Sequence, residues 1–274
     1  MRKHNVKHGA HTLYSVSRYW CLIWLSAFAV IIPLMIDATA TESQLPDGFV
    51  RLRDIDPTIV EDLRYATPEN FTGARVPGYA GNACILAEPV AVALAGVQRD
   101  LRYQGYVLKV FDCYRPKRAV AAFMKWAARR LDENARTKLY YPNIPRGDLV
   151  PRGYIARRSS HSLGTAVDLT IVTLKKNTEE NETFTGTSNK PPGPCNDQNA
   201  AQKLKEGADM GTSFDCFDSD SHTFSPNISR SARQNRLVLL RAMERHGFRN
   251  YRKEWWHYSM SLPGYSHPQD FQVD

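Results

Sequence analysis

Two separate segments of the chain contain the residue types that hold a catalytic metal ion. The first, SSHSLGTAVD, places His161 in a loop and Asp168 in the apolar stretch that follows. The second, EWWH, begins with an acid, Glu254, and ends with His257. A catalytic zinc takes three protein ligands, usually His with a carboxylate, and keeps a fourth position open for water. A lone His or Asp in an apolar strand is more often structural, but the joint occurrence of these segments favours a zinc site.

Apolar and β-branched stretches predict the strands that must position these residues. Residues 166–172 predict a central strand, and Gly164 just before it indicates a tight turn. Residues 107–111 predict a short buried strand that leads into a turn at 114–116. An aromatic, strand-like segment lies near 254–258. The predicted strands therefore present polar residues at their ends.

Helical spacing of apolar residues predicts three helices, at 88–103, 118–131 and 233–246. Gly105 ends the first of them. The polar segment 175–194, rich in Thr, Asn, Gly and Pro, predicts a surface loop. Since no internal repeat or linker divides the chain, we expect one α+β catalytic domain over residues 45–274.

The N-terminal segment predicts export. Basic residues precede an apolar run at 20–36, and Ala38-Thr39-Ala40 then supplies the small residues that a signal peptidase needs. We interpret residues 1–40 as a cleaved signal peptide, which places the mature protein in the periplasm or the medium without stable membrane association. The alternative is a retained N-terminal anchor, because the run is about long enough to span a bilayer. Pro33 and Asp37 favour cleavage.

Four cysteines remain after the predicted cleavage, since Cys21 lies in the signal segment. An even number in an exported chain permits two disulfides, with three connectivities open. We prefer Cys195 with Cys216, which would close the polar loop between them, and Cys84 with Cys113. A cysteine zinc site is the alternative, but no C-x-x-C pair exists and an oxidising compartment disfavours free thiolates.

The charge of the chain gives little indication of a partner. The formal net charge is +8, and a net three of these charges lie in the first 40 residues. No dense Lys/Arg stripe with interleaved aromatics and no nucleic-acid motif is present. We therefore predict a solvated basic surface and no nucleic-acid partner.

The two chemical segments together resemble the M15 metallopeptidase family, which includes the D-alanyl-D-alanine dipeptidases. The family pattern S-x-H-x-x-G-x-A-x-D, followed far downstream by E-x-W-H, is met here as SSHSLGTAVD and EWWH. The dipeptidase branch also resembles this chain at D-x-Y-R-P, residues 112–116, and at M-G-x-x-F-D, residues 210–215. The resemblance covers nearly all of residues 47–258. It implies a single domain of the D-Ala-D-Ala metallopeptidase or hedgehog-like fold, whose central antiparallel-type sheet carries the zinc.

Carried over by position, the resemblance implies the metal ligands and the proton carrier. One Zn²⁺ per chain would be bound by His161, Asp168 and His257. Glu254 would act as general base and then general acid, since a carboxylate beside the metal can take a proton from water and pass it to the leaving amine. Glu254 is therefore expected outside the ligand set.

The resemblance also implies three residues around the substrate. Arg115 would stabilise the oxyanion of the tetrahedral intermediate, a task that suits a fixed cation. Asp215 and Ser159 match residues that the family uses around the substrate, and a carboxylate is expected near the ammonium of a dipeptide. The chain departs from the shortest family members in its longer loop at 175–209, which bears on substrate choice and pocket depth.

These features predict a zinc-dependent enzyme that hydrolyses D-alanyl-D-alanine, or a similar small D,D-dipeptide, in cell-wall peptide metabolism. A D,D-carboxypeptidase or endopeptidase acting on longer peptidoglycan peptides is the alternative enzyme. A catalytically silent zinc module is a third interpretation, which Glu254 and Arg115 argue against, because a structural zinc needs no base. The physiological role and the oligomeric state stay open.

Overall fold

The computed structural model describes residues 44–129, 135–174, 193–197 and 207–274. The predicted signal or anchor at 1–40 and most of the predicted loop at 175–194 lie outside these residues. The described residues belong to one compact unit, Glu42–Asp274. None of the helices in this described part of the chain has the length and apolarity that a membrane span requires.

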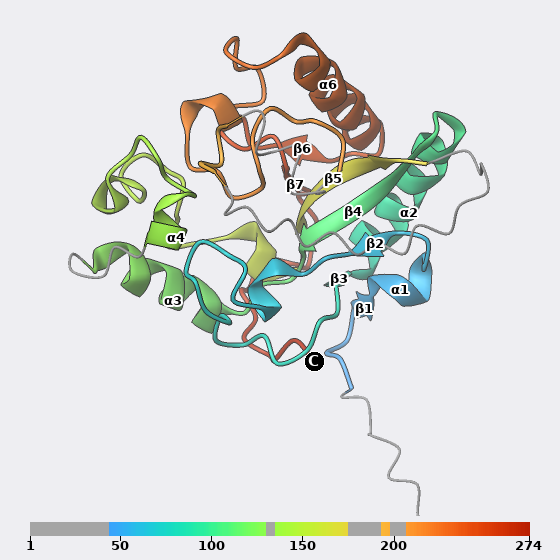
Figure 1. Cartoon of the computed structure of the whole chain (residues 1–274). Coiled ribbons are helices and arrows are strands. Elements are labelled where there is room, and N and C mark those ends of the chain that lie inside the picture. The colour runs from blue at the N-terminus through green and yellow to red at the C-terminus, as the bar shows by residue number, and fades with distance from the viewer. Residues whose placement is uncertain (1–43, 130–134, 175–192, 198–206) are drawn as a thin grey trace, which may run out of the picture. The chain divides into compact units, whose positions relative to one another are not determined.

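A five-stranded sheet forms the centre of the fold (Figure 1). Its strands, in spatial order, are β2 (Val60–Glu61), β4 (Tyr106–Asp112), β5 (Ala166–Thr173), β7 (His257–Ser259) and β6 (Arg249–Asn250). The pair β2 and β4 is parallel, and the other neighbours are antiparallel. A second sheet pairs β1 (Phe49–Arg51) with β3 (Ile85–Ala87). The structure is thus a mixed α/β domain in which the predicted central sheet is antiparallel except at its β2 edge.

Three longer helices pack around this sheet, namely α2 (Glu88–Tyr103), α3 (Lys117–Ala128) and α6 (Arg230–Arg245). Shorter helices are α1 (Leu52–Ile55) and α4 (Ala135–Lys138), and single 3₁₀ turns are η1 (Arg64–Ala66), η2 (Arg146–Asp148), η3 (Ser160–Leu163) and η4 (Ser219–Ser221). Helix α2 contacts both β4 and α6, while α3 follows the end of β4. In Figure 1, α2 and α6 lie toward one end of the β4 and β5 pair, and α3 lies toward the other.

The predicted helices are present, with corrections of three residues at two ends; α3 also begins one residue earlier and α6 ends one residue earlier than predicted. Helix α2 has the predicted bounds, but α3 ends at Ala128 rather than at 131, because Arg129 has an extended backbone (ψ 127°). Helix α6 begins at Arg230 rather than at 233, since the Ser229 hydroxyl accepts a hydrogen bond from the backbone N–H of Ala232 at 3.0 Å. A serine in this position caps the first turn.

The predicted strands at 107–111 and 166–172 are present as β4 and β5. The aromatic segment near 254–258 is strand only from His257 onward, and Glu254 to Trp256 form a turn before it. Trp255 and Trp256 are buried in the core instead of alternating across a strand. This turn has the aromatic composition of a strand because both of its tryptophan side chains are buried in the core.

The preferred cysteine pairing is confirmed. Cys84 is bonded to Cys113 and Cys195 to Cys216, with Cα to Cα distances of 5.3 and 5.4 Å. The first disulfide joins the end of β4 to the segment before β3. No cysteine is left to form a zinc site among the described residues.

Candidate active site

Three neighbouring strands bring acidic and imidazole side chains together at one end of the sheet. Asp112, the last residue of β4, lies opposite Asp168 of β5, and Asp168 lies opposite His257 of β7. Residues directly opposite each other on adjacent strands point to the same face. The sheet therefore presents two carboxylates and one imidazole side by side, although their sequence positions are far apart.

The turn η3 brings His161 to this group. The Ser159 hydroxyl accepts a hydrogen bond from the backbone N–H of His161 at 3.2 Å, which fixes the start of the turn. The turn closes at Gly164, whose φ is +71°. A Cβ added at Gly164 would lie 2.4 Å from a ring carbon of Phe49, so both the backbone angle and the space require glycine.

The orientation of the His161 ring is set by the end of β4. Its Nδ1 lies 2.6 Å from the carbonyl oxygen of Cys113. Since a carbonyl oxygen only accepts, Nδ1 carries the proton and donates it there, and Nε2 presents its lone pair to the pocket. Metal-binding histidines are commonly oriented in this way.

Three potential ligand atoms converge in front of the sheet. His161 Nε2 lies 3.2 Å from Asp168 Oδ1, His257 Nδ1 lies 3.0 Å from the same oxygen, and the two nitrogens are 3.1 Å apart. Ligands held at tetrahedral zinc distances are about 3.3 Å from one another. His161 Nε2 and Asp168 Oδ1 are both acceptors, and a cation bound between them and His257 Nδ1 would compensate all three atoms together. The three residues form a group that fits a metal ion.

The surroundings favour the protonation states that metal ligands need. Burial would raise the pKa of Asp168, but the adjacent His161 and His257 lower this pKa well below its usual range. Burial also lowers the pKa of His257, against the opposing effect of Asp168. An ionised carboxylate and a neutral imidazole are the forms that bind metals.

Arg115 lies beside this cluster in a fixed orientation. Its guanidinium forms an ion pair with Asp112 at 2.7 Å and reaches Asp168 Oδ2 at 3.4 Å. The guanidinium also lies over the rings of Tyr65 and Phe123, at 5.1 Å from each centroid. A cation held in this way can face developing negative charge without rearranging.

Glu254 stands next to the three ligand atoms without joining them. Its Oε2 is 4.0 Å from His257 Nδ1, and its side chain is 13% exposed. Burial raises the pKa of Glu254 well above its usual value, and the nearby charges of Asp168 and Asp215 raise it further. A carboxyl with a raised pKa can accept and release a proton near neutral pH.

Asp215 is a buried acid held in an unusual backbone conformation, with a φ of +58°. The Tyr65 hydroxyl donates to its carboxylate at 2.9 and 3.1 Å. Among the described residues, no basic side chain forms an ion pair with Asp215. Burial and the charge of Asp168 raise the pKa of Asp215 well above its usual value. A cation placed here would compensate this buried acid.

All seven residues singled out from the sequence line one cavity of about 310 Å³, namely Arg115, Ser159, His161, Asp168, Asp215, Glu254 and His257. Aromatic side chains form much of the remaining wall, among them Phe71, Phe217 and Trp256. This volume lies at the lower end of the range for small-ligand pockets. The cavity therefore suits a small molecule with two charged ends.

Sequence reasoning assigned no role to Asp112 and Tyr65. Asp112 pairs with Arg115 and also lies 3.3 Å from His161 Nδ1, while its other oxygen accepts from Tyr79 at 2.6 Å. The motif D-x-Y-R-P contains this aspartate three residues before the arginine, so the pairing could have been inferred. Tyr65 lies outside every motif, and no sequence signal indicates its contact with Asp215.

The fold and the cavity are typical of a metallohydrolase, in which a His, Asp and His group stands beside a carboxylate and an arginine that do not bind the metal. A family model described as D-ala-D-ala dipeptidase matches residues 46–181 and 175–273. The chain therefore belongs to the M15 peptidase family, and it is a hydrolase of the D-alanyl-D-alanine dipeptidase type.

Known relatives support the same assignment. The D-alanyl-D-alanine dipeptidase of Enterococcus faecalis is 38% identical over 216 residues, which is 79% of this chain and 93% of the relative. The D-alanyl-D-alanine dipeptidase of Streptomyces coelicolor is 36% identical over 73% of this chain and 84% of its own length. That of Escherichia coli is 28% identical over 77% of this chain and 83% of its own length.

Proposed function

We propose that this protein is a zinc-dependent D,D-dipeptidase that hydrolyses D-alanyl-D-alanine or a close analogue to free D-amino acids. The observation that supports it best is that one small cavity contains both the His, Asp and His group and Asp215, a buried acid without an ion-pair partner in the described part of the chain. Such a cavity offers both a place for the scissile bond and a partner for a free ammonium group. The relatives, which are D-alanyl-D-alanine dipeptidases, agree with this substrate.

We assign the metal to His161, Asp168 and His257. When bound, zinc would supply a Lewis acid that polarises the scissile carbonyl and lowers the pKa of water. Glu254 takes the proton from the attacking water and passes it to the leaving amine, which its position beside the ligands and its raised pKa support. Arg115 donates to the oxygen that becomes negative in the tetrahedral intermediate.

The remaining two residues bind the ends of the substrate in this proposal. Asp215 receives the substrate ammonium, and Ser159 lies at the end that receives the substrate carboxylate. An N-blocked peptide would leave the buried acid without its cation, which costs about 1–3 kcal/mol or more for a charged group. The carboxypeptidase alternative needs no such partner, because its substrates have an amide at that position.

Metal content tests the ligand assignment. The purified protein should contain about one zinc per chain, and the variants His161→Ala, Asp168→Ala and His257→Ala should each lose it, because three protein ligands leave no redundancy. Metal analysis by mass spectrometry decides the question. Full zinc occupancy in any two of these variants would exclude the assignment.

Substrate comparison tests the reaction. We expect kcat/KM for D-Ala-D-Ala to exceed that for its N-acetylated form and for a pentapeptide with the same two terminal residues by about 10-fold or more. Asp215→Asn should reduce this preference. If wild-type protein cleaves the pentapeptide as well as the dipeptide, the carboxypeptidase alternative is correct.

We further propose that the mature enzyme works outside the cytoplasm, in the periplasm or the medium, on cell-wall peptides. The predicted signal at 1–40 and the two disulfides support an oxidising compartment. An N-terminal anchor is the alternative. Sequencing the N-terminus of the protein recovered from its native host distinguishes cleavage after Ala40 from retention.

A further inference from the structure

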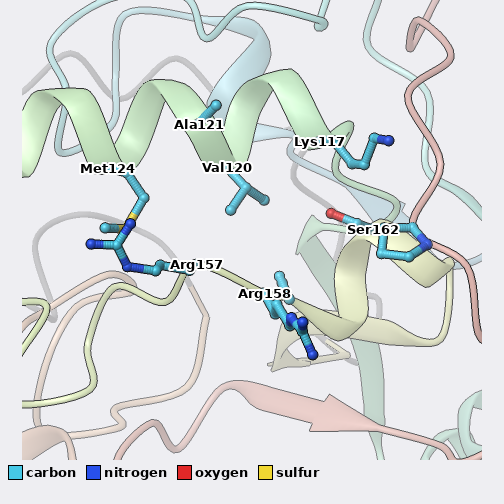
Figure 2. Close-up of a pocket in the computed structure, with 9 residues that line it drawn as sticks. Lys117, Val120, Ala121, Met124, Arg157, Arg158 and Ser162 are labelled. Carbon is cyan, nitrogen blue, oxygen red and sulfur yellow. The ribbon is translucent and has the colours of Figure 1, made fainter.

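A second cavity, of about 450 Å³, lies beside the catalytic one (Figure 2). Helix α3 forms one wall and contributes the apolar residues Val120 and Met124. The segment before η3 forms the opposite wall. Three cations, Lys117, Arg157 and Arg158, line this cavity, and no acid does. We call it the basic groove.

Two of these cations have no counter-charge in the described part of the chain. Arg157 and Arg158 are exposed and form no ion pair there. Lys117 has an acid in its surroundings, Asp270, but the ion pair of Asp270 is with Arg118 at 3.1 Å. The groove is therefore positively charged, and an anion entering it would meet no carboxylate on the lining.

An unpaired hydroxyl points into the same groove. Ser162 is 2% exposed, and its Oγ is buried without a hydrogen-bond partner. Figure 2 shows this oxygen directed toward α3. Buried hydroxyls are normally paired, so an unpaired one indicates a missing partner. A ligand with an acceptor oxygen would supply that partner.

The basic groove and the catalytic cavity share a wall. Arg158 and Ser159 line both of them. In the proposed function, Ser159 lies at the carboxylate end of the dipeptide, so the groove opens next to the C-terminal residue. The side chain of that residue would extend from there toward Lys117 and Arg157, which line the groove and not the catalytic cavity.

From this geometry we infer that the basic groove is a specificity subsite for the C-terminal residue, and that it favours D,D-dipeptides whose last residue has an acidic side chain. This inference rests on the proposed function. A side-chain carboxylate would face Arg157 and Lys117, and its second oxygen would accept from Ser162. The apolar wall of α3 would contact the methylene groups of the same side chain.

The test compares two substrates of equal shape and different charge. For wild-type protein, kcat/KM for D-Ala-D-Glu should exceed that for D-Ala-D-Gln by about 10-fold at low salt, since several exposed cations act together. Because exposed charges are screened by salt, the ratio should fall toward about 2 in 1 M NaCl. Equal rates for the two substrates at low salt, with D-Ala-D-Ala hydrolysed, would overturn the inference.

Variants locate the effect in the groove. Lys117→Gln combined with Arg157→Gln should lower the ratio at least about 3-fold, because both residues lie in the groove and outside the catalytic cavity. The matched control is Arg241→Gln, which removes an exposed arginine of α6 and should leave the ratio unchanged. A ratio that survives in the double variant, or falls equally in the control, contradicts the assignment.

A binding measurement separates this inference from the proposed function. Calorimetry should show that wild-type protein binds D-glutamate about 10-fold more tightly than D-glutamine, and that the double variant loses this difference. If the protein hydrolyses no dipeptide but shows this binding difference, the proposed function is rejected and the anion subsite is retained. Absence of the binding difference rejects the subsite whatever the activity.

Discussion

The four acidic side chains in and beside the pocket have different neighbours, and these neighbours suit each acid to a different role. Asp112 forms an ion pair with Arg115 at 2.7 Å, and Asp168 faces two imidazoles. Asp215 accepts only from a tyrosine hydroxyl among its described hydrogen bonds. Glu254 has a raised pKa because of burial and the two nearby acids. The pKa of Asp215 is raised as well, but Glu254 lies beside the potential ligand atoms, 4.0 Å from His257 Nδ1, so Glu254 is the group that we propose to carry a proton during the reaction.

This assignment predicts that Glu254→Gln retains its zinc but loses turnover. Glutamine keeps the size of the side chain and cannot take a proton, so kcat should fall by about 10²–10⁴-fold, with zinc content and Tm close to wild type. Steady-state kinetics with D-Ala-D-Ala and metal analysis of the same sample provide the measurement. The control is Asp47→Asn, which changes an exposed acid that is far from Glu254 in the sequence. A kcat within about 5-fold of wild type would remove Glu254 from the mechanism.

Among individual residues, the sequence predicts the site residues that belong to short recognisable motifs. The seven predicted residues meet in one cavity because the motifs fall at the ends of paired strands and in the turn before one of them. Tyr65 could not be predicted, because it reaches Asp215 across 150 positions of sequence through tertiary packing alone. Its neighbours in the chain give no chemical signal.

At the element scale, helix α6 holds the segment that carries Asp215. Arg236 of α6 is 1% exposed and donates to the carbonyl oxygens of Met210 at 2.8 Å, Asp220 at 2.9 Å and His222 at 2.6 Å. These carbonyls lie on both sides of Asp215 in the chain. One buried guanidinium therefore fixes both ends of the loop whose backbone is strained at Asp215.

Arg236→Met should loosen this loop without disturbing the three proposed metal ligands. We expect KM for D-Ala-D-Ala to rise about 10-fold or more and the free energy of unfolding to fall by about 3 kcal/mol, because three buried carbonyls lose their donors. Zinc content should stay at wild-type level. Arg241→Met on the exposed side of the same helix is the control, and Arg236→Lys should restore part of the affinity. An unchanged KM in the folded Met variant would exclude this positioning role.

The helices and strands were predictable where one periodicity dominates. Residues 88–103 have regular apolar spacing, and α2 has those bounds. The predicted start of α6 was wrong by three residues, because the helix begins at a serine cap and not at its first apolar residue. The turn at Glu254 was assigned to a strand since Trp255 and Trp256 are buried together, a tertiary effect that overrides the composition.

In the molecule as a whole, each of the two disulfides lies beside a different group of pocket residues. Cys113 provides the carbonyl that orients His161, and its partner Cys84 precedes β3. Cys216 directly follows Asp215, and the carbonyl of its partner Cys195 accepts from the backbone N–H of Ser213 at 2.9 Å. One disulfide thus supports His161 in the proposed metal site, and the other supports the proposed ammonium site.

This arrangement predicts that removing either disulfide affects a different property. The double variant Cys84→Ser with Cys113→Ser should bind zinc about 10–100-fold more weakly, because the carbonyl that orients His161 is no longer anchored. Cys195→Ser with Cys216→Ser should keep its zinc affinity and show a higher KM for D-Ala-D-Ala. Both should lose about 2–4 kcal/mol of unfolding free energy.

Each disulfide variant is the control for the other. Both should lose stability to a similar extent, and they differ only in which part of the pocket the lost disulfide supports. Zinc competition with a chelator and steady-state kinetics should be measured at a temperature well below both midpoints of unfolding, so that only folded protein is compared. If the two variants lose zinc affinity and gain KM to the same extent, the disulfides act only on global stability. A selective change in each supports separate anchoring of the two halves of the pocket, in which Cys113 fixes the proposed metal ligand His161 and Cys216 fixes Asp215, the acid that we propose to bind the substrate ammonium.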